Sequence, residues 1–288
     1  MLAAEPGCDP GGDDDDTTAA ADDDDDVTGG DWAAVTAGSH HSCGLSQDGD
    51  LRCWGSDAQA QTDSPPGSFS QVAAGNFHSC VLDGDGFPTC WGRCDEAQCE
   101  TPDEPFVSIA AGKGHSCGLR ADGSVACWGD PYEGQTEPPD GIGFVEVGLG
   151  ETHSCGRTDA GEIHCWGAGD LGQLDVPAGS FDRLSVGVFH SCGLTAEGTA
   201  LCWGRADDGQ TDAPAEPFAQ ISAGGGHSCA LRADGTAACW GMVTHAEYPP
   251  PPDIFSAIEA GGHHTCALTG DGVLRCWGWI GHGQCDPP

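Results

Sequence analysis

Basic residues are scarce in this chain. Nine lysines and arginines stand against 46 aspartates and glutamates, which gives a net charge of −37 at pH 7. A surface this acidic repels phosphate backbones, so nucleic acid is excluded as a partner. Apolar runs of about 18 residues are also missing, so no segment is predicted to cross a membrane as a helix.

The first 31 residues contain 12 of the acidic residues and none of the basic ones. Such a segment buries too little apolar surface to offset its ordering entropy, so we expect residues 1–31 to form a disordered, Asp-rich tether. The spaced ligands of a calcium loop are absent from it. Met1 to Cys8 lacks the basic and apolar regions of a signal peptide, so we expect that a leader was removed or that the true start lies upstream.

Eighteen cysteines in so acidic a chain indicate an oxidising compartment. Cys8, followed by the tether, resembles the first residue of a mature bacterial lipoprotein, although Glu5-Pro6-Gly7 matches the processing pattern poorly. An ordinary cysteine in a tail is the alternative. We therefore expect an exported protein, extracellular or on a bacterial cell surface, with membrane attachment only through a lipid on Cys8.

After residue 31 the chain consists of repeats. The pattern His-Ser/Thr-Cys, then a turn that ends in Gly, then Cys-Trp-Gly, occurs seven times. Its histidines are His41, His78, His115, His153, His190, His227 and His264. This spacing indicates a repeat architecture. Each repeat begins with an aromatic residue: Trp32, Phe69, Phe106, Phe144, Phe181, Phe218 or Phe255.

Each repeat contains three short β-like segments and no helical periodicity. Regular short strands with turns at fixed offsets and one tryptophan per unit are typical of β-propeller blades. We therefore predict that residues 32–288 form one all-β domain, a seven-bladed β-propeller with three- to four-stranded blades.

The second and third segments of each repeat are predicted to pair as a hairpin. In the first repeat the spacer fits a three-residue loop, Gln47-Asp48-Gly49, whose last residue takes a left-handed conformation that favours glycine. All seven repeats have glycine at this position: Gly49, Gly86, Gly123, Gly161, Gly198, Gly235 and Gly272.

This register places Cys43 opposite Cys53 at a non-hydrogen-bonded site, where the strands approach closely enough for a disulfide. The same offset recurs in every repeat. We therefore predict seven hairpin disulfides, Cys43–Cys53, Cys80–Cys90, Cys117–Cys127, Cys155–Cys165, Cys192–Cys202, Cys229–Cys239 and Cys266–Cys276.

One face of each hairpin combines small side chains with a tryptophan. In the first repeat Ser42, Gly44 and Trp54 share one face. We predict that the indole lies over the small residue at the Gly44 position and that successive blades stack through this tryptophan.

The repeat resembles that of the regulator of chromosome condensation family. In the third repeat the shared motifs are Ala111-Gly112, His115-Ser116, Asp122-Gly123, Trp128-Gly129 and Gly134-Gln135. The resemblance covers residues 32–288 and implies a closed ring of seven blades. In its paired cysteines the chain resembles the secreted bacterial branch of the family, which includes the propeller-type β-lactamase inhibitory protein. This resemblance implies that the chain binds a partner through loops on one face of the ring.

The family's eukaryotic founder exchanges nucleotide on a small GTPase and docks on chromatin. Neither role is expected here, because the cysteines and the charge argue against a nuclear protein and no basic tail is present. The His-x-Cys groups resemble zinc ligands, but their cysteines are predicted to bond each other, and histidines at a repeated position indicate packing. We expect no metal and no cofactor.

A catalytic site is not indicated by the sequence. A Cys–His pair would need one free thiolate, and carboxylates are too abundant here to be informative. We therefore expect that the protein is not an enzyme.

Four cysteines lie outside the sevenfold pattern. Cys94 and Cys99 are predicted to pair within the loop of the second repeat. Cys285 occupies the loop position of Cys99, but Ile280 stands where its local partner is expected. Either Cys8 and Cys285 pair with each other, or Cys8 carries a lipid and Cys285 keeps its thiol.

Partner-binding residues are expected where the repeats differ, because loops on a rigid ring vary at little cost to the core. One set of candidates directly precedes the repeat histidine and consists of His40, Phe77, Phe189 and His263. The other loop set contributes Tyr132, His245, Tyr248, Trp279 and His282. Aromatic residues at such positions are candidate interface anchors, and packing against a neighbouring loop is the alternative.

The first hypothesis is therefore a non-enzymatic, exported propeller, monomeric as a ring, that presents its loops to an extracellular protein or glycan. An inhibitor of an extracellular enzyme is the second hypothesis. An enzyme that acts on extracellular polysaccharide, and a structural surface protein without a saturable partner, are the remaining two.

Overall fold

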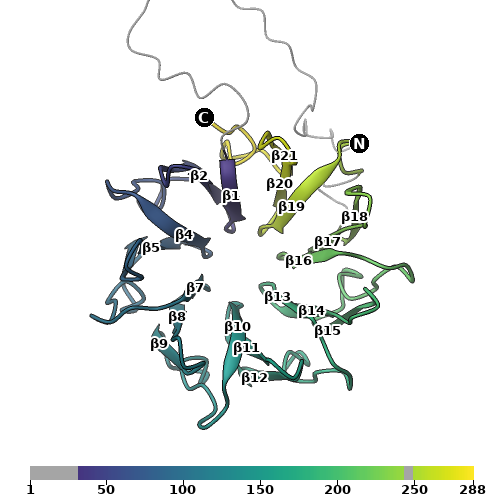
Figure 1. Ribbon diagram of the computed structural model, residues 1–288, viewed down its shortest axis with the longest axis horizontal. Helices are drawn as coiled ribbons and strands as arrows, with labels where there is room; N and C mark the ends of the chain where they lie inside the picture. Colours follow the sequence, from purple (N-terminus) through teal and green to yellow (C-terminus); the bar gives the residue numbers. More distant parts are fainter. Residues whose placement is uncertain (1–31, 243–248) are drawn as a thin grey trace, which may run out of the picture.

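The computed structural model describes residues 32–242 and 249–288. These residues form seven antiparallel sheets, each of three strands in chain order. Seen along its axis, the ring has its sheets arranged radially around an open centre (Figure 1). The predicted seven-bladed β-propeller is confirmed, whereas the tether predicted for residues 1–31 lies outside the described residues.

Each blade consists of an inner, a middle and an outer strand. The inner strands are β1 (Trp32–Ala37), β4 (Phe69–Ala74), β7 (Ser108–Ala111), β10 (Phe144–Leu149), β13 (Arg183–Val186), β16 (Gln220–Ala223) and β19 (Phe255–Ala260). The middle strands are β2 (His41–Ser46), β5 (His78–Asp83), β8 (His115–Leu119), β11 (His153–Thr158), β14 (His190–Leu194), β17 (His227–Leu231) and β20 (His264–Thr269). The outer strands are β3 (Leu51–Gly55), β6 (Pro88–Gly92), β9 (Val125–Gly129), β12 (Ile163–Gly167), β15 (Ala200–Gly204), β18 (Ala237–Gly241) and β21 (Leu274–Gly278).

The ring closes without exchanging a strand between its ends. Each sheet is built from a single repeat, and this includes the last sheet, β19-β20-β21. Strand β1 contacts both β19 and β20, so the first and last blades pack against each other as neighbouring blades do elsewhere. Among the described residues no helix is long and apolar enough to cross a membrane.

The hairpins have the predicted register. Cys43 lies opposite Cys53, and Leu45 lies opposite Leu51. The seven turn glycines have φ between 80° and 88°. All seven hairpin pairs are joined by disulfides, and an eighth joins Cys94 to Cys99. The disulfide pattern expected from the spacing is therefore present in the structure.

The packing of the tryptophan differs from the prediction in one respect. Trp54 does pack against the preceding blade, where it contacts Leu268 and Leu274. However, the ring that lies over Gly44 belongs to Trp32, since a Cβ on Gly44 would come within 2.5 Å of it. The reason is the cross-strand pairing: Trp54 lies opposite Ser42, which leaves Gly44 to the first aromatic residue of the repeat.

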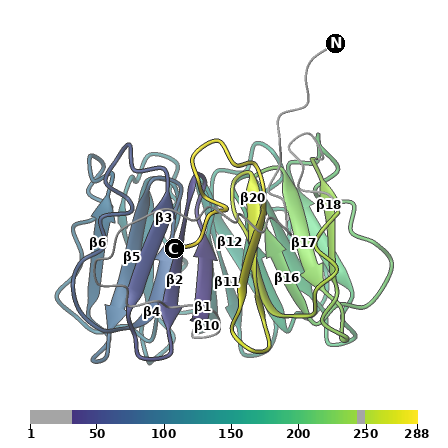
Figure 2. The ribbon, with the colours of Figure 1, turned by 90° about the horizontal axis from the view of Figure 1, so that it is seen from above.

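The strands run between two rims (Figure 2). We call one the hairpin rim, because it carries the tight turns between middle and outer strands. We call the other the histidine rim; it carries the loops between inner and middle strands and the loops that follow the outer strands. The candidate binding residues that the structure describes therefore lie on the histidine rim.

Candidate binding rim

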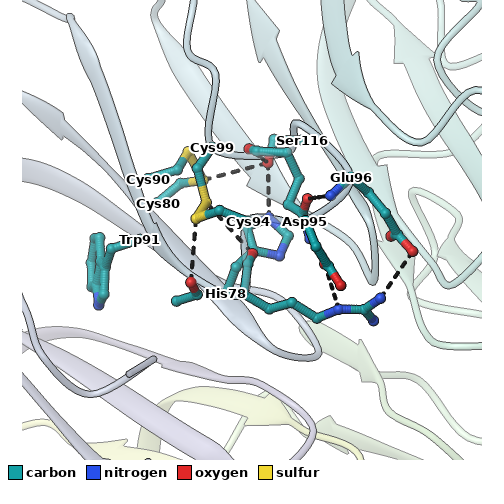
Figure 3. Close-up of a disulfide and its surroundings, with 12 residues drawn as sticks. His78, Cys80, Cys90, Trp91, Cys94, Asp95, Glu96, Cys99 and Ser116 are labelled. Carbon is teal, nitrogen blue, oxygen red and sulfur yellow. Dashed lines mark hydrogen bonds and ion pairs between the residues drawn. A yellow bond between two sulfur atoms is a disulfide. The ribbon is translucent and has the colours of Figure 1, made fainter. Parts of the chain in front are cut away.

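A closed belt of hydrogen bonds lies just below the histidine rim. Each repeat histidine places its Nε2 against the hydroxyl of the Ser or Thr in the next blade. The pairs are His41–Ser79, His78–Ser116, His115–Ser154, His153–Ser191, His190–Ser228, His227–Thr265 and His264–Ser42, at 2.7 to 3.0 Å. The last pair closes the ring across 222 residues of sequence. Figure 3 shows His78 and Ser116 in this arrangement.

The belt also fixes the protonation of its histidines. The Ser154 hydroxyl donates to the backbone oxygen of Gln135 at 2.9 Å, so its oxygen is left to accept from His115. The Nε2 of the histidine therefore carries the proton. Burial lowers the pKa of His115 to about 3, and those of the other belt histidines to about 3 or about 4. These side chains are neutral structural groups, not candidate acids or ligands.

In six of the seven repeats a glutamine in the loop after the outer strand joins the blades a second time. The backbone oxygen of Gln135 accepts the indole N–H of Trp166 from the next blade at 2.9 Å. The side-chain oxygen of the same glutamine accepts the N–H of Glu133 and so shapes its own loop. The Gly134-Gln135 motif contributed to the family resemblance, but this bond between blades was not predicted from it.

At the junction of the last and first blades the rim departs from sevenfold symmetry. His40 lies at the centre of a group that we call the seam cluster: His40, Phe77, His263, Trp279 and His282. The ring of His40 is 5.8 Å from His263, 5.4 Å from His282 and 6.3 Å from Phe77. Trp279 packs edge-on against His282 at 4.8 Å and against His40 at 5.5 Å.

The seam cluster joins residues that are far apart in the chain. His40 and Phe77 precede belt histidines of the first two blades, whereas Trp279 and His282 come from the loop after β21. Burial, together with the nearby His263 and His282, lowers the pKa of His40. Five of the nine predicted binding residues are thus brought together in one place.

A pocket of about 380 Å³ opens beside the seam cluster. His40, Phe77 and His282 line one side, and the loop after β3 lines the other. Arg93 completes the wall; its guanidinium lies 6.0 Å from the centre of the Phe77 ring. The pocket therefore combines aromatic, imidazole and guanidinium groups.

The loop that carries Arg93 is held by a local disulfide. Cys94 and Cys99 are joined across five residues of sequence. Arg93 contacts Asp95 at 2.6 Å and Glu96 at 3.0 Å within this loop. The Cys94–Cys99 disulfide and the two ion pairs hold one wall of the pocket in place.

A second hollow, of about 270 Å³, lies at the mouth of the central channel; we call it the mouth hollow. Phe77, Phe189 and His263 line it together with Val188 and Met242. Arg205 lies 5.7 Å from the ring centre of Phe189, as Arg93 does beside Phe77. Phe189 thus belongs to the same rim as the seam cluster without touching it.

The remaining candidates lie apart from these sites. Tyr132 is 89% exposed and does not join the seam cluster. His245 and Tyr248 lie outside the described residues, as does Cys8. Cys285 is buried, with its sulfur 3.6 Å from the backbone oxygen of Trp279. In the part of the chain that the structure describes, no three His, Cys, Asp or Glu side chains form a group that could hold a metal ion.

Comparison with known proteins agrees with this architecture. The family model described as the regulator of chromosome condensation (RCC1) repeat matches residues 32–61, 106–135, 144–173, 181–210, 218–242 and 255–284. The second repeat, which carries the Cys94–Cys99 staple, is not matched. No curated protein matches the chain.

Several solved structures are similar over most of the ring. The ectodomain of the Physcomitrella patens receptor kinase CR4 is 27% identical, with 86% of this chain and 74% of that chain covered and a TM-score of 0.74. The ectodomain of the Arabidopsis thaliana receptor kinase ACR4 is 25% identical, with 86% and 96% covered and a TM-score of 0.72. Prp20p from Saccharomyces cerevisiae shares the fold at 17% identity, with 85% and 82% covered and a TM-score of 0.68.

Proposed function

This chain belongs to the regulator of chromosome condensation repeat family, and from that premise we propose that it is an exported, non-enzymatic binding protein that holds a protein partner on its histidine rim. The observation that carries the proposal is the seam cluster. Five side chains that break the sevenfold repeat gather there, beside a pocket and next to the mouth hollow.

The chemistry of the rim favours a protein partner. Aromatic side chains and arginines are the residues that most often anchor protein interfaces, and here Phe77 and Phe189 each lie beside an arginine. Both arginines are already paired with carboxylates of their own loops, which holds them in position. A partner would meet a largely preformed surface, so little conformational entropy is lost on binding.

Two observations support export. Eight disulfides stabilise a ring whose belt is otherwise held by hydrogen bonds, and disulfides persist in oxidising compartments. The similar receptor-kinase structures are ectodomains. The proposal includes no enzymatic activity, since the hairpin cysteines are oxidised and the belt histidines are buried and hydrogen-bonded to serine or threonine.

Site-specific photo-crosslinking tests the proposal. A photoreactive phenylalanine analogue replaces Phe77 on the histidine rim or, as the matched control, Phe87 in the hairpin turn of the same blade, which is 40% exposed. The full chain is applied to intact cells of its source. We expect a saturable crosslink to one protein from position 77, competed by the unlabelled ring but not by its Trp279→Ala variant, and none from position 87.

The outcomes separate the alternatives. Equal labelling from both positions, or labelling that does not saturate, would overturn the proposal in favour of a structural surface protein. Capture of an extracellular enzyme whose activity falls at equal molar ratio would identify the partner class as an enzyme under inhibition. Turnover of a polysaccharide by the purified ring would overturn the non-enzymatic part.

A further inference from the structure

The central channel continues inward from the mouth hollow. Its upper end has a volume of about 130 Å³ and is lined by the last residues of the inner strands. Ser39, Asn76, Val188 and Gly262 line both this space and the mouth hollow. The two spaces therefore form one path that leads from the histidine rim into the ring.

One carboxylate stands at the upper end of this channel. The position four residues after the first aromatic of each repeat is small and uncharged in six repeats, where it is Thr36, Ala73, Ala110, Gly148, Ser185 or Ser222. In the seventh repeat it is Glu259, which lines the channel together with Thr36, Ser185 and Ser222. Of the seven equivalent positions, only that of Glu259 carries a charged residue.

The Glu259 carboxylate has little to neutralise it. Its hydrogen bond is a long one, 3.5 Å from the Ser222 hydroxyl, whose oxygen also accepts the N–H of Ala260 at 2.8 Å. No ion pair to Glu259 occurs among the described residues. The side chain is accessible from the channel, but protein surrounds the channel on all sides, and this enclosure raises the pKa of Glu259 to about 7.

The mouth hollow above Glu259 is lined in part by apolar side chains, while Ser39 and Asn76 lie where it meets the channel. Phe77, Val188, Phe189 and Met242 line it. Its lysine and its arginine already have partners: Lys113 lies 2.6 Å from Glu151, and Arg205 lies 3.0 Å from Asp207. A partly apolar entrance thus leads to one carboxylate that has no ion pair among the described residues.

We propose that this path is a binding site for a primary alkylammonium group, presented as a lysine side chain of the protein partner. The methylene chain would lie against the mouth residues and the ammonium beside Glu259. A compact ammonium on a slender stem suits so narrow a channel better than the broad plane of a guanidinium. That the ammonium belongs to a protein partner rests on the proposed function, whereas the site itself can be tested directly with a small amine.

The enclosure of Glu259 couples this binding to pH. In the empty channel the carboxyl takes up a proton near neutrality, but an ammonium beside it favours the ionised form. Binding therefore releases a proton, and affinity rises by up to about tenfold per pH unit below the pKa of the empty site. Above that pKa the affinity becomes independent of pH.

The first experiment measures the pKa of Glu259 by carboxyl-carbon NMR on the full chain. The spectrum is titrated with n-butylammonium chloride, with sodium chloride at equal ionic strength, and with n-butanol. We expect n-butylammonium to lower the pKa by about one unit or more and the two controls to leave it unchanged. Glu259→Gln should weaken amine binding at least tenfold, while Glu133→Gln, on an exposed loop of the same rim, should not.

The inference fails if n-butylammonium leaves the Glu259 resonance unmoved, or if the Glu259→Gln ring binds the amine as well as the unaltered ring does. Near-ultraviolet circular dichroism checks that the variant is folded. A crosslink from position 77 that persists undiminished in Glu259→Gln would leave the proposed function standing and remove lysine insertion. If the unaltered ring binds the amine but gives no crosslink from position 77, the amine site would stand and the proposed function would be overturned.

Discussion

Histidines one residue apart in the chain lie in two different environments. His41 is fully buried, has a pKa lowered to about 3 and bonds to Ser79 of the next blade. His40 is half-buried and packs among aromatic rings from two other blades. The first environment occurs seven times around the ring and the second occurs at one seam.

The difference follows from what a closed ring requires. Every junction between blades must be made in the same way, so the belt residues are repeated with the blades. Rim loops carry no such requirement and can vary. In this protein the repeated positions hold the blades together, and the positions that break the repeat are those to which we assign binding. Glu259 follows the same rule inside the channel.

Acidification should have the largest effect, because it acts on all seven belt histidines together. Their unfolded pKa is near 6.5 and their folded values are about 3 to 4, so below pH 6.5 the unfolded chain takes up protons that the ring does not. Each histidine then lowers the free energy of unfolding by up to about 1.4 kcal/mol per pH unit, so the seven together lower it by up to about 10 kcal/mol per pH unit. We expect cooperative unfolding well above pH 4.

Urea midpoints measured across this range check the prediction. Glu259 opposes the trend, since its raised pKa favours the folded ring as pH falls, but it is one group against seven. Replacing His115 by Gln should reduce the proton uptake on unfolding by about one. A free energy of unfolding that stays level from pH 6.5 down to pH 4 would contradict the structural role of the belt.

Single histidine substitutions compare the two environments directly. His115→Ala leaves a cavity between blades and removes the donor to the buried Ser154 hydroxyl, which should cost about 2 to 4 kcal/mol. His282→Ala removes an exposed side chain and should cost less than about 1 kcal/mol. Urea denaturation with the disulfides intact measures both. An equal loss in the free energy of unfolding for the two variants would contradict the difference between belt and rim.

Disulfide removal should have an intermediate effect. Replacing Cys117 and Cys127 by serine opens a loop of ten residues inside a blade and should cost about 2 to 3 kcal/mol. Replacing Cys94 and Cys99 opens a loop of five residues, so we expect a smaller loss of global stability. Hydrogen exchange should instead increase within residues 93–99. A larger loss in the free energy of unfolding from removing Cys94–Cys99 than from removing Cys117–Cys127 would contradict this prediction.

The smallest effect on stability should come from Phe77→Ala, which removes a half-buried ring from the seam. We expect a loss of about 1 kcal/mol or less in the free energy of unfolding. Partner binding should nevertheless fall by about tenfold or more, because interface anchors of this kind dominate affinity. Titration of the captured partner measures the second quantity. Val107→Ala, an exposed residue near the hairpin rim, is the control that should change neither.

Much of the blade was predictable from local spacing. The ten-residue offset between Cys43 and Cys53 and the glycine at position 49 specified the hairpin register. The position of the indole was not predictable, because both Trp54 and Trp32 could cover Gly44 on the same face. The tertiary structure decided between them: Trp32 covers Gly44, and Trp54 packs against the preceding blade.

The binding candidates were predicted as a set, but their arrangement was not. His40 and His282 are 242 positions apart, and they meet because closing the ring places the last loop beside the first blade. Arg93 and Arg205 were missed, since the sequence did not indicate that each would lie beside a rim phenylalanine.

The sequence by itself determined the number of blades, the three strands of each and the disulfides within them, because all of these depend on residues a few positions apart in a repeated unit. The tertiary structure decided what lies between units: the bond from His264 to Ser42, the seam cluster, and the enclosure of Glu259. These features depend on the ring closing, which brings both ends of the chain together and surrounds a channel with seven strands.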